Sequence, residues 1–366
     1  MKVECVKEKI RNAVMLAEKM TGKNLSLPVL GSILFLAKGK VLKVRATNLD
    51  IGIEIEVPSK VDKEGVVAIP GGVLNNLLST VDDKSVFFEF QNDNIVIKTK
   101  NSRALIKSLP HDDFPTLPSI SQKRESIEIS AEKLVLGLRS VWYSAATSEI
   151  KPEIASIYMY GENGEIFFVA TDSFRLAEKK IDFIPAKTIS PIIIPLKNAP
   201  DIIRVFDTIS GDVRVSFNNS QISFETSGLY LTSRVVDGIF PDYKQIIPND
   251  FKTEAVVLKQ DIVNALKSTA MFKDKFNQIS ILIDPQNKKL EIHSKNPDIG
   301  ENVIRVDAAL SGDTLNLNFN HKYIFDCFQS IGRDSVSLQF NGEARPMIIR
   351  GVGDTSFTYL VMPLNQ

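Results

Sequence analysis

The sequence lacks the features that mark a secreted, membrane-spanning or disulfide-stabilised protein. It has only two cysteines in 366 residues, Cys5 and Cys327, and they lie near opposite ends of the chain. That count excludes a disulfide framework, and no Cys-x-x-Cys pair is present for metal or redox chemistry. No run of about 18 apolar residues is present to cross a membrane, and the charged first residues do not predict a signal peptide. We therefore expect a cytoplasmic protein without a membrane partner.

The chain also has no excess of charge of either sign. Its 44 Lys and Arg residues are balanced by 44 Asp and Glu residues, so the formal net charge is zero. A protein that holds DNA mainly through its overall charge should be basic, because phosphate neutralisation supplies that affinity. The balance excludes such a protein, and it also excludes an acidic solvating tail. A neutral body with basic residues concentrated on its helices stays possible.

Known catalytic signatures are missing as well. The sequence has no P-loop, no G-x-S-x-G elbow and no G-x-G-x-x-G, and its three histidines, His111, His293 and His321, stand singly. Adjacent acids occur at 82–83 and at 112–113, but a metal site needs further ligands at known spacing. We predict no catalytic residue, no cofactor and no metal. A hydrolase or metal enzyme that uses Asp112 and Asp113 is the alternative from another class.

What the sequence does contain is an internal repeat. Three segments open with a short strand and an amphipathic helix, starting at Val3, Ile127 and Ala255. The strands that follow begin around Ser32, Ser156 and Ser280, which are spaced 124 and 124 residues apart. A second helical stretch and a hairpin then complete each segment. The clearest helix starts after Ser130, a plausible N-cap, and its apolar stripe comprises Leu134, Val135, Leu138, Val141, Trp142 and Ala145.

This repeat predicts the fold class. The strands alternate apolar and polar residues, which is typical of antiparallel, half-buried strands, and the helices should gather on one side of the sheets. We expect an α+β protein of three repeated domains, each with two helices and antiparallel sheets, covering residues 1–122, 123–250 and 251–366. Gene triplication without functional meaning is one interpretation. Closure of the repeats into a ring is the sharper hypothesis, because the units are too large for common solenoids.

Five stretches carry a family resemblance. LTSRVVDGIFPDYKQIIP at 231–248, VATDSFRLA at 169–177, the terminal YLVMPLNQ, SLPVLGSILF at 26–35 and LPHDDFPTLP at 109–118 resemble, in order, segments of the DNA polymerase III beta subunit family, the bacterial sliding clamps. The resemblance runs from residue 1 to residue 366. It implies a head-to-tail homodimer whose domains of the clamp fold form a closed ring around duplex DNA. It further implies tethering of the replicative polymerase, loading by a clamp loader, no catalysis and a nucleoid-associated place in the cytoplasm.

The resemblance also implies site residues. For the DNA-facing surface these are Lys23, Lys133, Arg139, Lys151, Lys197, Arg204 and Lys267. For a hydrophobic groove that takes short peptides from the polymerase, the loader and other clamp-motif proteins, they are Ile154, Thr171, Ser173, Phe174, Arg175, Leu176, Pro241, Gln245, Ile246, Pro346, Val361, Met362, Pro363 and Leu364. For the dimer interface they are Ala104, Leu105 and Ile106 at one end and Met271 and Phe272 at the other.

The chain departs from the family pattern at several of these positions. Ser173 and Phe174 replace the family's Gly-His, and basic residues often found at Gln245 and Asn365 are absent, so groove preference should shift toward apolar peptides. Ala104 is smaller than the aromatic residue often found there, which puts the strength of the dimer contact in doubt. A peptide-binding scaffold of the same fold that does not bind DNA is the second alternative.

Overall fold

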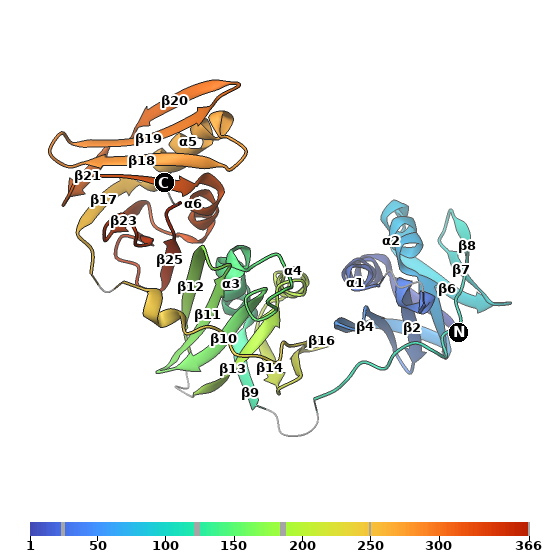
Figure 1. The fold of residues 1–366 in the computed structure, drawn as a ribbon. Helices are drawn as coiled ribbons and strands as arrows, with labels where there is room; N and C mark the ends of the chain where they lie inside the picture. Colours follow the sequence, from blue (N-terminus) through green and yellow to red (C-terminus); the bar gives the residue numbers. More distant parts are fainter. Residues whose placement is uncertain (23–25, 121–124, 184–187, 249, 365–366) are drawn as a thin grey trace. The chain divides into compact units, whose positions relative to one another are not determined.

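The computed structural model describes residues 1–22, 26–120, 125–183, 188–248 and 250–364. In these residues six α-helices and 25 strands recur in the predicted order, and every strand pair between them is antiparallel (Figure 1). Each repeat consists of one strand, a helix, a group of strands, a second helix and three more strands. The α+β prediction is therefore confirmed.

The first repeat has eight strands and two helices. They are β1 (Lys2–Val6), α1 (Lys7–Lys19), β2 (Ser32–Lys38), β3 (Val41–Thr47), β4 (Ile51–Lys63), β5 (Gly65–Pro70), α2 (Gly71–Thr80), β6 (Ser85–Gln91), β7 (Asn94–Lys98) and β8 (Arg103–Lys107). The helices α1 and α2 pack against each other and against strands β2 to β5. Apolar residues every three or four positions along α1, such as Ile10, Val14 and Ala17, are fully buried and explain that contact.

The second repeat follows the same plan. It comprises β9 (Glu125–Ser130), α3 (Ala131–Val141), β10 (Ser156–Glu162), β11 (Glu165–Thr171), β12 (Arg175–Asp182), β13 (Ile189–Pro195), α4 (Ala199–Phe206), β14 (Asp212–Phe217), β15 (Gln221–Thr226) and β16 (Leu229–Arg234). Ser130 caps α3, since its Oγ accepts the backbone N–H of Lys133 at 3.3 Å. The helix ends at Val141, earlier than its apolar stripe predicts, and Trp142–Ser144 continue as a 3-10 turn.

The third repeat differs only by one extra short strand. It comprises β17 (Thr253–Leu258), α5 (Lys259–Thr269), β18 (Gln278–Asp284), β19 (Lys289–Asn296), β20 (Gly300–Arg305), β21 (Ala308–Ser311), β22 (Leu315–Asn320), α6 (His321–Cys327), β23 (Ser335–Phe340), β24 (Met347–Gly351) and β25 (Phe357–Val361). The helix α5 packs on α6 and on β17, β19 and β20.

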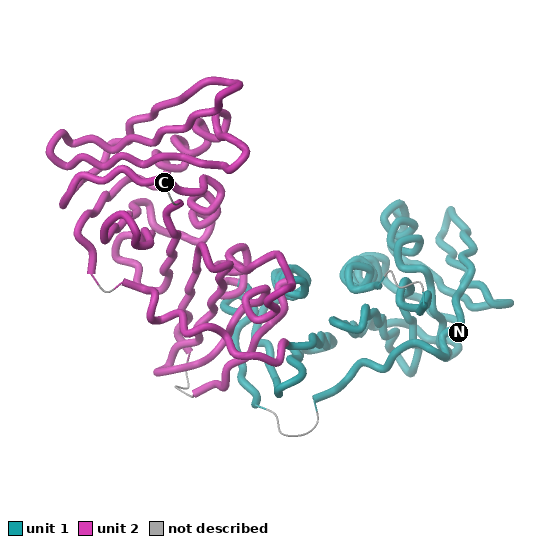
Figure 2. Tube along the Cα trace, in the orientation of Figure 1, with its two compact units in different colours: residues 1–135, 197–235 teal, residues 136–196, 236–366 magenta. Residues whose placement is uncertain are grey.

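Backbone hydrogen bonds run across the junctions between repeats. β16 of the second repeat pairs with β4 of the first, and β12 of the second pairs with β25 of the third. Two compact units result, residues 1–135 with 197–235 and residues 136–196 with 236–366 (Figure 2). The second repeat therefore contributes strands to both units, because its two sheets continue into different neighbours.

Candidate functional site

An open cavity of about 590 Å³ lies on the second compact unit, where β12 pairs with β25. Strands and loops from the second and third repeats both contribute to it. Nine of the residues expected in the peptide groove line it: Thr171, Ser173, Phe174, Arg175, Leu176, Gln245, Ile246, Pro346 and Met362. We call this cavity the groove. The structure thus brings together segments that are up to 191 residues apart in the sequence.

Five expected residues do not line the groove: Ile154, Pro241, Val361, Pro363 and Leu364. Six others do, and the resemblance had not indicated them: Pro248, Asp250, Asn341, Ala344, Arg345 and Leu360. Leu360 lines the groove in place of the expected Val361 because successive side chains of a strand point to opposite faces. Leu360 lies opposite Leu176 in the register, and both line the groove, whereas Val361 is fully buried on the other face.

The floor of the groove continues into an aromatic core. Leu176 and Leu360 belong to one buried cluster with Tyr160, Phe240 and Tyr243. Tyr243 opens the 3-10 turn Tyr243–Ile246, which also carries the groove residues Gln245 and Ile246. This wall is therefore fixed by the side chain of Tyr243, which anchors the turn in the core.

Tyr243 is held by a buried hydrogen-bond network. Its hydroxyl donates to Glu178 Oε2 at 2.6 Å and lies 2.7 Å from the hydroxyl of Tyr160. Burial and the Glu178 carboxylate raise the pKa of the Tyr243 phenol well above its usual range. The phenol therefore stays protonated and can donate to Glu178 at any physiological pH.

A tight turn between β11 and β12 forms another part of the groove. Thr171 Oγ1 donates to the carbonyl of Arg175 at 2.7 Å and accepts the backbone N–H of Ser173 at 3.1 Å. Asp172 Oδ1 accepts the backbone N–H groups of Phe174 and Arg175, both at 3.0 Å. Ser173 adopts a φ of 77°, a left-handed backbone conformation that favours glycine. The Phe174 side chain is left 59% exposed.

Arg175 is part of the groove but has no free charge to offer a ligand. Its side chain is 7% exposed, and its guanidinium forms ion pairs with Asp172 at 2.9 Å and Asp326 at 2.8 Å. It also lies over the ring of Tyr323, 4.4 Å from the centroid. Arg175 therefore ties the groove to α6 rather than presenting a cation to solvent.

The described DNA-facing candidates are all exposed. Lys23 lies outside the described residues, and the six others are Lys133, Arg139, Lys151, Lys197, Arg204 and Lys267. Lys197 pairs with Asp50 at 2.8 Å, and Arg204 pairs with Asp201 one turn earlier on α4. Such exposed pairs are worth little energy, so they do not remove these cations from the surface.

The helices carry a modest positive charge. Counted from their sequences, α1, α3 and α5 have net charges of +2, +1 and +1, and α2, α4 and α6 are each neutral. Because the whole chain is neutral, the remainder carries the opposite excess. The helices hold ten of the 44 basic residues, so the concentration of basic residues on the helices is small.

The dimer candidates lie on one sheet edge and beside another. Ala104, Leu105 and Ile106 lie on β8, the last strand of its sheet, and Leu105 is 55% exposed. Met271 and Phe272 lie in a 3-10 turn that contacts the edge strand β20, and Met271 is 65% exposed. Each end thus presents an apolar side chain next to an unpaired strand edge.

The residues considered for enzymatic chemistry are scattered. Asp112 and Asp113 are exposed loop residues, and the described part of the chain has no group of three or more His, Cys, Asp or Glu that could hold a metal. His321 is buried with Nε2 2.7 Å from the carbonyl oxygen of Leu266. Burial lowers the pKa of its imidazole, which keeps the ring neutral. No helix in the described segments is long and apolar enough to span a membrane.

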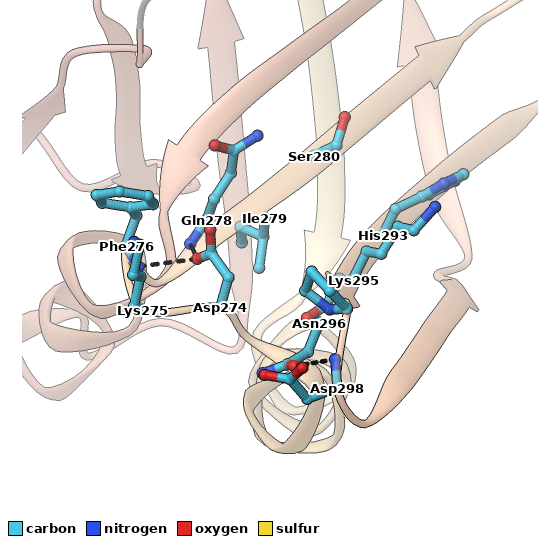
Figure 3. Close-up of a pocket in the computed structure, with 12 residues that line it drawn as sticks. Asp274, Lys275, Phe276, Gln278, Ile279, Ser280, His293, Lys295, Asn296 and Asp298 are labelled. Carbon is cyan, nitrogen blue, oxygen red and sulfur yellow. Dashed lines mark hydrogen bonds between the residues drawn. The ribbon is translucent and has the colours of Figure 1, made fainter.

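A second cavity, of about 610 Å³, lies within the third repeat (Figure 3). It opens between the loop that carries Phe276 and the strand β19, which contributes His293 and Lys295. Asp274 Oδ1 caps the loop by accepting the backbone N–H groups of Phe276 and Gln278, both at 3.0 Å. No motif or repeat pattern in the sequence indicates this cavity. It differs from the groove because all its residues come from one repeat.

The fold defines a class of protein: three similar α+β repeats whose antiparallel sheets continue across the junctions between them. Family models match almost the whole chain: the N-terminal domain of the DNA polymerase III beta subunit at residues 1–118, its central domain at 128–242 and its C-terminal domain at 244–365. The chain belongs to the DNA polymerase III beta subunit family.

Individual relatives agree with this assignment. The beta sliding clamps of Synechococcus elongatus and Bacillus subtilis are each 26% identical to the chain, and each match covers 100% of it and 99% of the relative. A crystal structure of the DNA polymerase III beta subunit from Thermotoga maritima has the same fold, with a TM-score of 0.93 at 24% identity. That match covers 100% of this chain and 99% of the other. A Pseudomonas aeruginosa sliding clamp bound to griselimycin gives a TM-score of 0.94 at 22% identity, with full coverage of both chains.

Proposed function

We propose that this chain is a DNA sliding clamp, a processivity factor that encircles duplex DNA as a head-to-tail dimeric ring and tethers the replicative polymerase. Membership of the DNA polymerase III beta subunit family over its full length is the observation that carries the proposal. Sliding clamps are accessory factors in DNA replication, so the chain is not a catalytic subunit. Its three domains follow the repeats, at 1–122, 123–250 and 251–366.

Ring closure requires two complementary ends. A head-to-tail contact joins different surfaces of two identical chains and closes into a ring when the rotation is right. The edge strand β8 exposes Leu105 between the basic residues Arg103 and Lys107. The edge strand β20 exposes Val303 between the acidic Glu301 and the basic Arg305. Apolar contact, an ion pair of Glu301 with a basic residue of β8, and free backbone hydrogen-bonding groups favour pairing of β8 with the partner's β20.

The charge distribution suits sliding. A topologically closed ring does not need tight phosphate contacts, which would slow its movement along DNA. The net charge of +4 on the six helices of one chain becomes +8 in a dimer, enough for a weakly attractive lining. Lys133, Arg139 and Lys267 lie on the positive helices α3 and α5 and are the residues we place nearest to DNA.

The groove is the proposed docking site for the polymerase, the clamp loader and other partners. A cavity of about 590 Å³ with a floor of Leu176 and Leu360 holds one or two apolar side chains of a short peptide. Burial of each apolar anchor would contribute about 1.5–3 kcal/mol, which gives weak and exchangeable binding. Such binding allows several partners to share one clamp in turn.

Ring assembly is tested by sedimentation equilibrium at micromolar concentration. We expect twice the mass of one 40.7 kDa chain. Leu105→Asp and Met271→Asp should each produce monomers, while Val352→Asp, an exposed change in the turn between β24 and β25, should leave the dimer intact. A monomer at tens of micromolar would contradict the ring as the resting state.

A further inference from the structure

We propose that Phe174 determines the peptide specificity of the groove by contacting an apolar side chain of the bound segment. This inference rests on the proposed function, because it assigns a role within the docking site. The partner is a short peptide segment that places an aromatic or leucine side chain over the Phe174 ring. The comparison that carries it is with a second copy of the same turn inside the chain.

The turn that carries Phe174 occurs twice with the same backbone hydrogen bonds. Its copy, 124 residues earlier, runs from Thr47 to Ile51. Thr47 Oγ1 donates to the carbonyl of Ile51 at 2.9 Å, as Thr171 does to that of Arg175 at 2.7 Å. The carbonyl of Asp50 accepts the backbone N–H of Arg234, the last residue of β16, and that of Phe174 accepts the N–H of Met362, the residue after β25, both at 2.8 Å. Asp50 is thus the counterpart of Phe174.

The two copies of the turn differ in how far neighbouring side chains cover them: the copy at 47–51 is covered, and the copy at 171–175 is open. In the first unit Asp50 pairs with Lys197 at 2.8 Å, and Leu117 covers Gly52, the counterpart of Leu176. The segments FPTLPSI (114–120) and FPDYKQI (240–246) follow each other's pattern, and their last residues are Ile120 and Ile246. Ile120 is 6% exposed, whereas Ile246 is 53% exposed.

The fold therefore does not require an exposed aromatic ring at this turn. One copy is closed by an ion pair and a leucine, and the other leaves Phe174, Ile246 and Met362 exposed around a cavity. The backbone of Phe174 is fixed on both sides, by its N–H to Asp172 at 3.0 Å and by its carbonyl to Met362 at 2.8 Å. A ring on such a rigid support can contact a ligand with little loss of conformational entropy.

The chemistry of the surrounding groove defines the side chain that Phe174 selects. Aromatic rings favour apolar and aromatic neighbours, and the thioether of Met362 adapts to either. Arg175, the nearest charged neighbour in the sequence, is buried and paired, so it does not attract an acidic side chain. The exposed charged residues of the lining are Asp250, just before the third repeat begins, and Arg345, in a loop of the third repeat. A polar side chain placed over the Phe174 ring would lose hydration, and the ring itself offers it no strong hydrogen-bond partner.

The test selects peptides rather than assuming a sequence. Phage-displayed random octapeptides are selected on the wild-type protein, and enriched peptides are kept if Met362→Arg, which blocks the groove, abolishes their binding. Selection is repeated on Phe174→Ser. We expect one position of the wild-type set to be rich in Phe, Trp and Leu and to lose that preference on the variant. A wild-type peptide should bind Phe174→Ser about tenfold more weakly in fluorescence polarisation, and Phe174→Tyr should restore most of the affinity.

Two results separate the failure of this inference from failure of the proposed function. If groove-dependent peptides show the same preference on wild type and Phe174→Ser, Phe174 is not the determinant, although the groove binds peptides. If no selected peptide depends on Met362, the groove itself is not a docking site. Phe87→Ser, which changes an exposed phenylalanine on β6 of the first unit, is the matched control and should bind like the wild type.

Discussion

Leu49 and Ser173 share a left-handed backbone conformation, with φ values of 79° and 77°, at matching places in two turns that are 124 residues apart. Neither residue is glycine, so both turns hold an L-residue in a conformation that costs roughly 1–2 kcal/mol. The hydrogen bonds of Thr47 and Thr171, and those of Asn48 and Asp172, compensate for that cost. Asn296, a further 124 residues along, again accepts a backbone N–H, from Asp298 at 2.9 Å.

Replacing Ser173 by glycine should stabilise the protein. Glycine removes the steric cost of the positive φ but increases the entropy of the unfolded chain, so we expect a net gain of about 0.5–1 kcal/mol in the free energy of unfolding. Ser173→Ala keeps the Cβ and is the matched control, which should show no gain. Urea denaturation of the three proteins measures the difference, and equal stability of the glycine and alanine variants would contradict the account.

The buried ion pairs of Arg175 should contribute far more to the free energy of unfolding than the exposed ion pair between Lys322 and Asp326. Arg175→Ala leaves Asp172 and Asp326 without their buried partner, and we expect a loss of about 3–5 kcal/mol. Lys322 also pairs with Asp326, at 2.5 Å, but its side chain is 62% exposed. Lys322→Ala should therefore cost less than about 1 kcal/mol. If urea denaturation shows similar losses of unfolding free energy for both variants, Arg175 is not the main partner of Asp326.

Removal of the Tyr243 hydroxyl should loosen the groove wall. Tyr243→Phe leaves Glu178 without the 2.6 Å hydrogen bond, which costs about 1–3 kcal/mol for a buried acceptor. The turn that carries Gln245 and Ile246 should then exchange its amide hydrogens faster and bind groove peptides more weakly. Tyr230→Phe is the control, because the Tyr230 hydroxyl donates to the carbonyl of Pro118 outside the groove, at 2.7 Å. Unchanged hydrogen exchange at 243–246 would contradict this role.

His321 should make the stability depend on pH. Burial lowers the pKa of His321 in the folded state, so the unfolded chain binds a proton more readily. The free energy of unfolding should therefore fall as the pH drops below about 6.5, the value of an unperturbed histidine, toward the lower folded-state pKa. His321→Gln should reduce this slope between pH 7.5 and pH 5.5. An identical slope in the variant would assign the pH dependence to other groups.

The order of helices and strands could be predicted from the sequence because the same pattern of apolar residues occurs in each of the three repeats. Ser32 and Ser156 open β2 and β10 as expected, and Ser280 lies two residues inside β18. Amphipathic spacing in Leu134, Val135 and Leu138 correctly indicated the buried face of α3. The end of that helix was less predictable, because the apolar spacing continues into the 3-10 turn after Val141.

The groove could be predicted only in part. Every residue of β25 is buried, so alternation gives no signal for the face that forms the groove. The family resemblance implies Val361, whereas Leu360 lines the cavity. The pairing of β12 with β25 joins residues far apart in the sequence, which no local pattern reveals. Residues such as Asn341 and Arg345 reach the groove through that pairing of the sheets.

The central claim is that this protein is held on DNA by topology rather than by affinity. The most direct measurement loads the protein onto nicked circular DNA with its loader, removes free protein and then linearises the circle. We predict stable retention on the circle and rapid release once the DNA has ends. Retention on linear DNA would show ordinary DNA binding, and failure to load onto the circle would favour a peptide-binding scaffold that does not encircle DNA.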